Sequence, residues 1–112
     1  MDSVESVEAV LKKIHKQYIE SPKSIDVRAL GAIYGAYLGE SIRRHRSGAK
    51  WETDDPTLGE KTYPLIYKGS RAYPLAWCFR RITNGPEENV WLKLKVFLRE
   101  DIEIVQETPN IT

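Results

Sequence analysis

Cysteine is almost absent from this chain of 112 residues, which contains only Cys78. A lone cysteine excludes an intramolecular disulfide framework and a metal site built from several cysteines. Because proteins that rely on disulfides belong to oxidising compartments, this scarcity favours a reducing one, and we expect a cytoplasmic location. Cys78 lies in the stretch Leu-Ala-Trp-Cys-Phe-Arg-Arg without a neighbouring histidine, so we predict a buried and unreactive thiol.

The chain also lacks a large excess of charge of either sign. Its 17 basic and 16 acidic residues give a formal net charge of +1. A nearly neutral protein has no overall field that would draw it to nucleic acid or a membrane, so any electrostatic function must be local. Residues 1–20 mix both signs where a secretory signal needs an apolar run, and we expect no export signal. The apolar run at 30–38 is much shorter than the ~20 residues of a membrane span.

Neither an internal repeat nor a long linker divides the sequence. Hydrophobic residues make up 41% of the chain and charged residues 29%, which is the composition of an ordinary globular domain. The length suits one hydrophobic core rather than two. We therefore predict a single domain over residues 1–112, with an N-terminal helix within 1–22 and a C-terminal tail over 100–112 as extensions.

Apolar residues at helical spacing predict a helix at the start of the chain. Steps of three and four separate the apolar residues of this segment, and charged residues occupy the opposite side. Asp2 or Ser3 is suited to cap the helix, because short polar side chains accept hydrogen bonds from the first free amides. We expect it to run from about Ser3 to Glu20 and to stop before Pro22.

A second helix is predicted from a cap at Ser24 or Asp26 to the basic turn that precedes Gly48. Three glycines lie four residues apart on one stripe of it: Gly31, Gly35 and Gly39. Each glycine costs about 1 kcal/mol relative to alanine in a helix, so close packing must compensate. We expect a buried central helix whose stripe contacts a helix or a strand, within one chain or between two. A phosphate-binding glycine loop is disfavoured, since its glycines would follow a strand.

Helical spacing stops after Gly48, where glycine, proline, threonine and aromatic residues become frequent. Strands at 63–67 and 70–73 can form a hairpin around Lys68 and Gly69, because glycine readily adopts the positive φ of a tight turn. A third strand near 49–52 would support this hairpin, which is rarely stable with two strands alone.

Two prolines mark helix starts in the last third of the chain. Pro74 takes the first turn of a helix that ends at Asn84 and Gly85, and Pro86 begins a further segment with two glutamates near its positive end. Residues 90–98 alternate well enough to form a strand, but the Pro-Glu-Glu start favours a helix. The tail beyond them adds a short strand or simply trails.

The predicted fold class is therefore α+β. Two N-terminal helices pack with a small antiparallel β-hairpin or sheet, and one or two further helices complete the domain.

Residues with catalytic or metal-binding chemistry are few. His15 and His45 lie on different predicted helices and share no spacing that would place two ligands on one metal, so we expect no metal site and no cofactor. We expect His15 at the surface or at the boundary of the core. Signatures of a nucleophile elbow, a P-loop and a dinucleotide fold are absent, and we predict that the chain is not an enzyme.

An acidic cluster of Glu52, Asp54 and Asp55 follows Trp51. Such carboxylates can bind a hard cation or share a proton in acid–base catalysis, and they can equally cap a turn. Because the regular ligands of a calcium loop are missing, we favour an exposed acidic loop that meets a basic partner. In this interpretation Trp51 is the aromatic anchor of a protein interface and the three carboxylates surround it.

The strongest basic cluster lies at the end of the second predicted helix and consists of Arg43, Arg44, Arg46 and Lys50. Arg80 and Arg81, with nearby aromatic residues, would extend it into a surface for phosphate contacts and base stacking. A basic helix end is also ordinary, because cations suit the helix dipole. Nucleic-acid or nucleotide binding through the four residues of the cluster is therefore the alternative to protein binding.

Two ordered segments, LGAIYGAYLGESIRRHRSGAKW and YPLIYKGSRAYPLAWCFRRITNGPEENV, resemble a group of small bacterial domains of unknown function. In those domains a glycine-bearing helix and a tryptophan lead into a hairpin, a Tyr-Pro-Leu helix start and an Asn-Gly-Pro turn. The resemblance spans residues 28–98 and brings no catalytic residue with it. Related domains occur among immunity proteins of bacterial toxin systems. The resemblance therefore implies a non-catalytic domain that binds and neutralises a cognate toxin.

Overall fold

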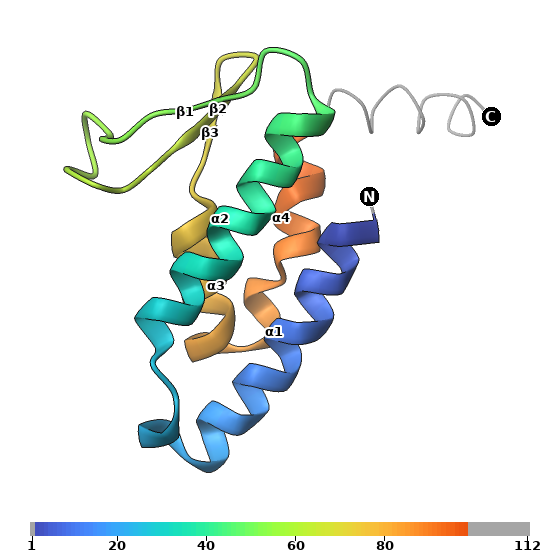
Figure 1. Ribbon diagram of the computed structural model, residues 1–112, viewed down its shortest axis with the longest axis vertical. Helices are drawn as coiled ribbons and strands as arrows, with labels where there is room; N and C mark the ends of the chain where they lie inside the picture. The colour runs from blue at the N-terminus through green and yellow to red at the C-terminus, as the bar shows by residue number, and fades with distance from the viewer. Residues whose placement is uncertain (1, 99–112) are drawn as a thin grey trace.

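The computed structural model describes residues 2–98, with side chains from residue 6 onward, and has the predicted α+β architecture. Helices lie along the long axis of the molecule, and a small sheet lies toward one end of them (Figure 1). The main elements in chain order are α1 (Asp2–Glu20), α2 (Val27–His45), β1 (Lys50–Trp51), β2 (Leu65–Tyr67), β3 (Ser70–Ala72), α3 (Pro74–Asn84) and α4 (Val90–Phe97). The first helix begins one residue before the predicted start.

The ends of α2 follow the predicted signals. Of the two candidate caps, Asp26 is the one used, and its side chain accepts a hydrogen bond of 3.1 Å from the backbone N–H of Ala29. The helix ends at His45, after a last turn of basic residues. Gly48 then takes a φ of +89°, a conformation that suits glycine, and the chain turns into β1.

The predicted hairpin and third strand form an antiparallel sheet in the order β1-β2-β3. Lys68 and Gly69 both have positive φ, as a two-residue type I′ turn requires. The strands are shorter than predicted. Tyr63 has a φ of +48°, outside the extended region, and β2 begins only at Leu65. At the far end, Tyr73 serves as the N-cap residue of α3 rather than as a strand residue.

The last third of the chain confirms a helix at Pro74–Asn84 and a second helix, rather than a strand, at Val90–Phe97. The prediction of one continuous segment from Pro86 is wrong. Pro86–Glu88 form a single 3-10 turn, after which Asn89 begins α4 by accepting a hydrogen bond of 3.0 Å from the N–H of Leu92. The tail, for which a strand or a trailing end was expected, lies outside the described residues.

The glycine stripe of α2 packs within the chain, as one of the two alternatives predicted. A Cβ on Gly35 would lie 2.7 Å from the backbone nitrogen of Leu75 and 2.8 Å from the carbonyl oxygen of Pro74. Real Cβ atoms essentially never approach other atoms within 3.0 Å, so only glycine allows α2 this close to α3. Gly31 faces Phe79 less tightly, at 3.1 Å from an added Cβ, and Gly39 faces the ring of Trp51.

The core lies between the helices and one face of the sheet. It includes Leu11, Leu38, Leu65 and Ile82, all at most 1% exposed. Cys78 is fully buried as predicted, and burial raises the pKa of its thiol to about 12, which leaves it protonated and unreactive.

A buried ion pair connects α1 to the C-terminal half of the domain. The Nε of Arg81, a residue only 2% exposed, donates to Oε2 of Glu8 over 2.9 Å. The other carboxylate oxygen of Glu8 accepts a hydrogen bond of 3.0 Å from the N–H of Val90, at the start of α4. His15, half-buried at the predicted boundary position, adds a contact of 2.6 Å between its Nδ1 and the carbonyl of Ile82. One side of α1 thereby holds both α3 and α4.

Replacing Gly35 with alanine tests the close contact of α2 and α3. In an open helix this change would stabilise by about 1 kcal/mol. Here the added Cβ meets backbone atoms, and we expect a loss of about 1–3 kcal/mol from overpacking, measured by chemical denaturation. Gly31→Ala should cost less, because its Cβ would lie 3.1 Å from Phe79. A Gly35→Ala variant more stable than the wild type would contradict this packing.

Glu8→Ala tests the buried ion pair. Removing one partner leaves the Arg81 guanidinium buried without its carboxylate, which costs about 3–5 kcal/mol of the free energy of unfolding. The double variant Glu8→Ala, Arg81→Met removes both charges and should recover part of that loss. Denaturant titrations of the wild type, the two single variants and the double variant give the coupling energy. A double variant less stable than Glu8→Ala would show that the isolated charge is not the main cost.

Candidate functional site

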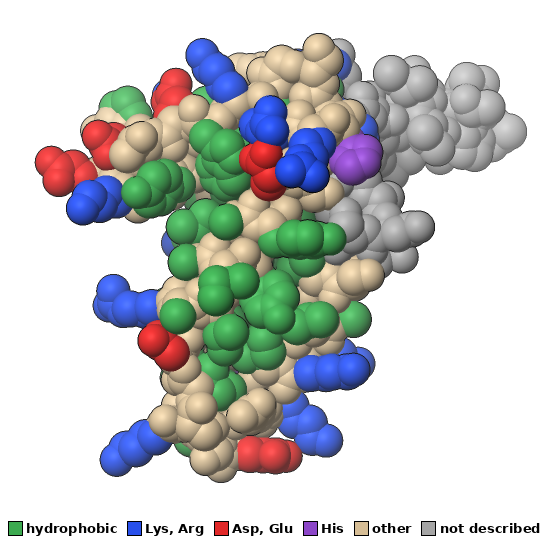
Figure 2. Space-filling view, in the orientation of Figure 1, with side chains coloured by type: hydrophobic (Ala, Val, Ile, Leu, Met, Phe, Trp, Pro, Cys, Tyr) green, Lys and Arg blue, Asp and Glu red, His purple; other side chains and the backbone are tan. Residues whose placement is uncertain are grey.

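The outer side of α2 is apolar and exposed. Residues 29–39 carry no charged side chain. The predicted burial of this helix is therefore correct only for the glycine side, since Ile33 is 60% and Tyr37 55% exposed, and Ala32 and Ala36 are exposed beside them. Figure 2 shows hydrophobic side chains gathered along the front of the molecule, where α2 runs in Figure 1. A helix that is apolar on every side normally has both sides covered.

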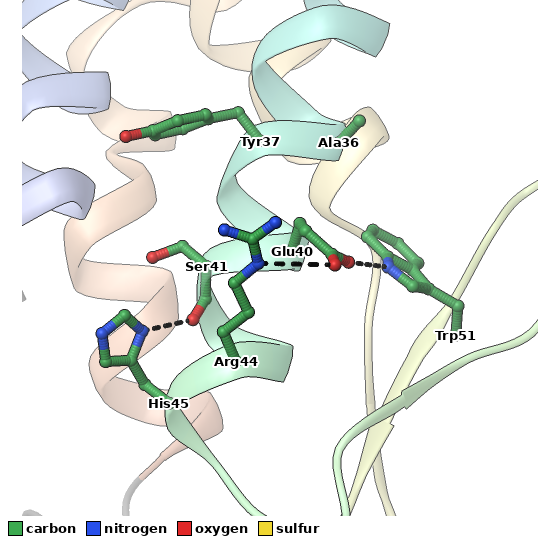
Figure 3. Close-up of a pocket in the computed structure, with 7 residues that line it drawn as sticks. All are labelled: Ala36, Tyr37, Glu40, Ser41, Arg44, His45 and Trp51. Atoms are coloured by element: carbon green, nitrogen blue, oxygen red, sulfur yellow. Dashed lines mark hydrogen bonds and ion pairs between the residues drawn. The ribbon is translucent and has the colours of Figure 1, made fainter.

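A groove runs beside this apolar face. The segment between β1 and β2 projects away from the helices (Figure 1). Residues of α2 help to line three hollows on this side of the molecule. The first has a volume of about 660 Å³ and is lined by Ala36, Tyr37, Glu40, Ser41, Arg44, His45 and Trp51 (Figure 3). The second, of about 390 Å³, is lined by Ala32, Ala36, Trp51, Tyr63 and Leu75.

The third hollow has a volume of about 370 Å³ and lies between α2, α3 and the β1–β2 segment. It is lined by Arg28, Ala32, Leu58, Lys61, Thr62, Tyr73, Leu75, Ala76, Phe79 and Arg80. The second hollow shares Ala36 and Trp51 with the first, and Ala32 and Leu75 with the third. The three hollows therefore adjoin one another, and we refer to them together as the α2 groove.

Glu40 organises the end of the α2 groove nearest the sheet. Its two carboxylate oxygens accept hydrogen bonds of 3.0 and 2.9 Å from the Nε of Arg43, and Oε2 accepts one of 3.1 Å from the indole N–H of Trp51. The Nε of Arg44 lies 3.7 Å from Oε1 (Figure 3). The hydrogen bonds from Arg43, and then that from Trp51, lower the pKa of Glu40 to about 2. Glu40 is thus ionised and holds the indole in place.

Trp51, the predicted interface anchor, has a structural role as well. Its ring packs on Gly39, where an added Cβ would collide with Cη2 and Cζ2. This contact attaches the sheet to α2 and explains the third glycine of the stripe. The indole is half-buried, and it also lines two hollows of the α2 groove.

The predicted basic cluster does not form one free cationic surface. Arg43 and Arg44 both pair with Glu40, while Arg46 is half-buried and Lys50 is exposed on β1. The suggested extension through Arg81 is wrong, because that side chain is buried against Glu8. Of the cluster, Arg44 lines the α2 groove.

Asp55 contradicts the expectation of an exposed acidic loop. It is 5% exposed, and its Oδ1 accepts hydrogen bonds from the N–H groups of Leu58 and Thr57 at 2.9 and 2.8 Å. Its Oδ2 accepts one of 2.7 Å from the Tyr73 hydroxyl. The N–H of Leu58, the hydroxyl of Tyr73 and the N–H of Thr57 lower the pKa of Asp55. The alternative that this carboxylate caps a turn is correct for Asp55, because the turn's amides need an acceptor.

The other two carboxylates of the acidic cluster are also engaged. Glu52 lies 3.3 Å from the Nη1 of Arg71, and the same nitrogen lies 3.5 Å from Asp55. Asp54 is exposed, and its Oδ1 accepts a hydrogen bond of 2.8 Å from the N–H of Lys61. The three side chains therefore stabilise the segment between β1 and β2 and do not form one acidic patch.

The returning part of that segment presents Lys61, Thr62 and Tyr63 to the α2 groove, and the backbone of the first and last of these is unusual. Lys61 and Tyr63 have φ values of +55° and +48°, which are uncommon for residues other than glycine. Asp54 fixes the first, and a backbone hydrogen bond of 3.0 Å from the Tyr63 N–H to the carbonyl of Thr53 fixes the second. Both side chains line the groove, in its third and second hollows respectively.

Sequence reasoning missed most residues of this surface, among them Ile33, Tyr37, Leu58 and Phe79. For the first two a signal exists, since the charge-free stretch at 29–39 provides no polar side for a helix. The others come together only through the path of the β1–β2 segment, which no periodicity reveals.

The Asp55 hydrogen bonds predict a pH response. Because these hydrogen bonds favour the ionised carboxylate, the pKa of Asp55 in the folded protein lies below its ordinary value of 3.8. The free energy of unfolding that they contribute is fully present above pH 3.8 and is lost as the pH falls through the pKa of the folded state. NMR titration of the Asp55 carboxyl carbon should therefore give a midpoint below 3.8. In Tyr73→Phe, which removes the hydroxyl donor, the midpoint should move up. A wild-type midpoint at or above 3.8, or one unchanged in Tyr73→Phe, would contradict these hydrogen bonds.

Comparisons with protein-family models, with curated proteins and with solved structures gave no match. Among residues 2–98, no group of three or more histidine, cysteine, aspartate or glutamate side chains is arranged to hold a metal ion. In the same part of the chain, no helix has the length and apolarity needed to cross a membrane.

Proposed function

We propose that this chain is a non-catalytic domain that binds another protein through the outer face of α2 and the α2 groove. The observation that carries the proposal is the exposure of Ile33 and Tyr37 on a helix with no charge from 29 to 39. Exposed large apolar side chains that adjoin one another mark interaction surfaces, whereas single ones are normal. Here they adjoin the α2 groove, which Tyr37 itself helps to line.

The composition of this surface suits a protein partner. Tyrosine, tryptophan and arginine are the residues that contribute most often to binding energy at interfaces, and Tyr37, Trp51 and Arg44 line one hollow. The surface is also held rigid. Gly35 packs α2 on α3, and Glu40 fixes the indole of Trp51, so little side-chain and backbone freedom is lost on binding.

Neutralisation of a bacterial toxin is the specific form of protein binding that we propose. The resemblance to small bacterial domains related to immunity proteins supports this form, and a rigid apolar surface suits occlusion of an active site. Nucleic-acid binding has less support, because Arg43 and Arg44 share the carboxylate of Glu40. The acidic interface proposed from the sequence has less support too, since Asp55 is buried within its own turn.

A matched pair of substitutions tests this function. Ile33 on α2 is 60% exposed and Ile19 on α1 is 64% exposed, so aspartate at either position removes a similar exposed side chain. The tagged wild type, Ile33→Asp and Ile19→Asp would each be used to capture partners from a lysate of the source cells after nuclease and salt treatment. We expect one protein to be retained by the wild type and Ile19→Asp, and Ile33→Asp to bind it at least about tenfold more weakly.

Melting temperatures of the three proteins control for misfolding, and co-expression tests the toxin form. The captured protein should inhibit growth when expressed alone, and the wild type should relieve this inhibition while Ile33→Asp does not. Equal capture by all three proteins would refute a binding role for the α2 face. Capture that disappears with nuclease would favour the nucleic-acid alternative.

A further inference from the structure

The α2 groove carries a local excess of positive charge in a chain that is nearly neutral. Of its lining residues, Arg28, Arg44, Lys61 and Arg80 are basic, whereas Glu40 is the one acidic residue among them. The whole chain has a formal net charge of only +1. Because Glu40 already pairs with Arg43 and Arg44, the excess is concentrated in the third hollow.

The three cations of the third hollow come from three different elements. Arg28 lies in the first turn of α2, Lys61 in the β1–β2 segment and Arg80 on α3. All three are exposed, and none of them forms an ion pair with a described residue, while the charge of Arg80 contributes at longer range to the lowered pKa of Glu88. By contrast, Arg71, Arg81 and Lys93 each pair with a carboxylate.

Apolar side chains lie between these cations. Leu58 is 59% and Phe79 37% exposed, and Ala32, Leu75 and Ala76 also belong to the apolar lining. A hollow of this kind suits a large apolar side chain, while the surrounding cations suit carboxylates next to it in the same segment. Aliphatic side chains outnumber the two rings of Tyr73 and Phe79 in this lining, which favours a peptide over stacked bases.

We propose that the α2 groove recognises an acidic segment of the partner protein, with one large apolar side chain in the third hollow and carboxylates on Arg28, Lys61 and Arg80. This inference rests on the proposed protein-binding function and names the chemistry of the partner. Charge complementarity of this kind selects partners and raises the rate of association more than it raises affinity. The hydrogen bond from the Lys61 N–H to Asp54 contributes by fixing the backbone that carries one of the cations.

Selection from a random peptide library displayed on phage tests the proposal without knowledge of the natural partner. Immobilised wild-type protein should enrich peptides in which aspartate or glutamate flanks leucine, phenylalanine or tryptophan. The dissociation constant of the best peptide, labelled with fluorescein, would then be measured by anisotropy against Arg28→Glu, Lys61→Glu and Arg80→Glu. Each reversal should weaken binding by about tenfold, and added salt should weaken binding to the wild type.

The matched control is Lys23→Glu, which reverses the charge of an exposed lysine outside the lining of the groove. Lys23 lies in a short 3-10 turn, Pro22–Ser24, that connects α1 to α2. It should change the dissociation constant by less than about twofold, within the range of a charge that makes no contact. Equal losses in Lys23→Glu and Arg80→Glu would overturn the proposal, because the attraction would then be nonspecific. Tighter binding of a labelled single-stranded oligonucleotide than of the selected peptide would also overturn it.

The failure of this inference is distinguishable from failure of the proposed function. Neutral or basic peptides from the selection, together with loss of the captured partner in Ile33→Asp, would refute an acidic segment and leave protein binding intact. Acidic peptides whose binding is insensitive to Arg28→Glu, Lys61→Glu and Arg80→Glu would place the segment elsewhere and refute the assignment to the α2 groove.

Discussion

The backbone contact between α2 and α3 is the constraint on which the rest of the structure depends. Gly35 lies directly against Pro74 and Leu75, and there is no space for a side chain between the helices. One turn further along the same stripe, Gly39 packs against the ring of Trp51, which attaches the sheet to the same helix. The opposite side of α2 is then left facing solvent, with Ile33 and Tyr37 upon it. One close approach therefore determines both the packing of the domain and the position of its candidate binding surface.

The secondary structure was largely predictable because its signals are local. Asp26, Gly85 and the Lys68-Gly69 turn act on residues within a few positions of themselves, and the structure uses them as caps and turns. The glycine stripe predicted close packing correctly, because helix-weakening residues need compensation. It gave no information on what covers the other side of α2, since a periodic pattern describes a helix and not its neighbours.

The charged residues were less predictable because their partners lie far away in the sequence. Glu8 and Arg81 are 73 positions apart, and nothing near either residue indicates a buried pair. The sequence predicted Asp55 in an exposed acidic cluster, but the hydroxyl of Tyr73, 18 positions later, donates a hydrogen bond to its carboxylate. The cations around the third hollow likewise come from α2, the β1–β2 segment and α3. Grouping charged residues by their proximity in the sequence was therefore wrong for both the acidic and the basic residues.

The two sides of α2 also differ in how freely evolution can alter them. On the side of Gly31, Gly35 and Gly39, any added atom meets another part of the protein. On the side of Ala32, Ile33, Ala36 and Tyr37, the side chains are exposed, and none of them belongs to the buried core. Descendants of this domain can therefore diverge in what they recognise while they keep the same architecture. Residues that maintain the fold and residues that can alter binding specificity therefore lie on opposite sides of the same helix.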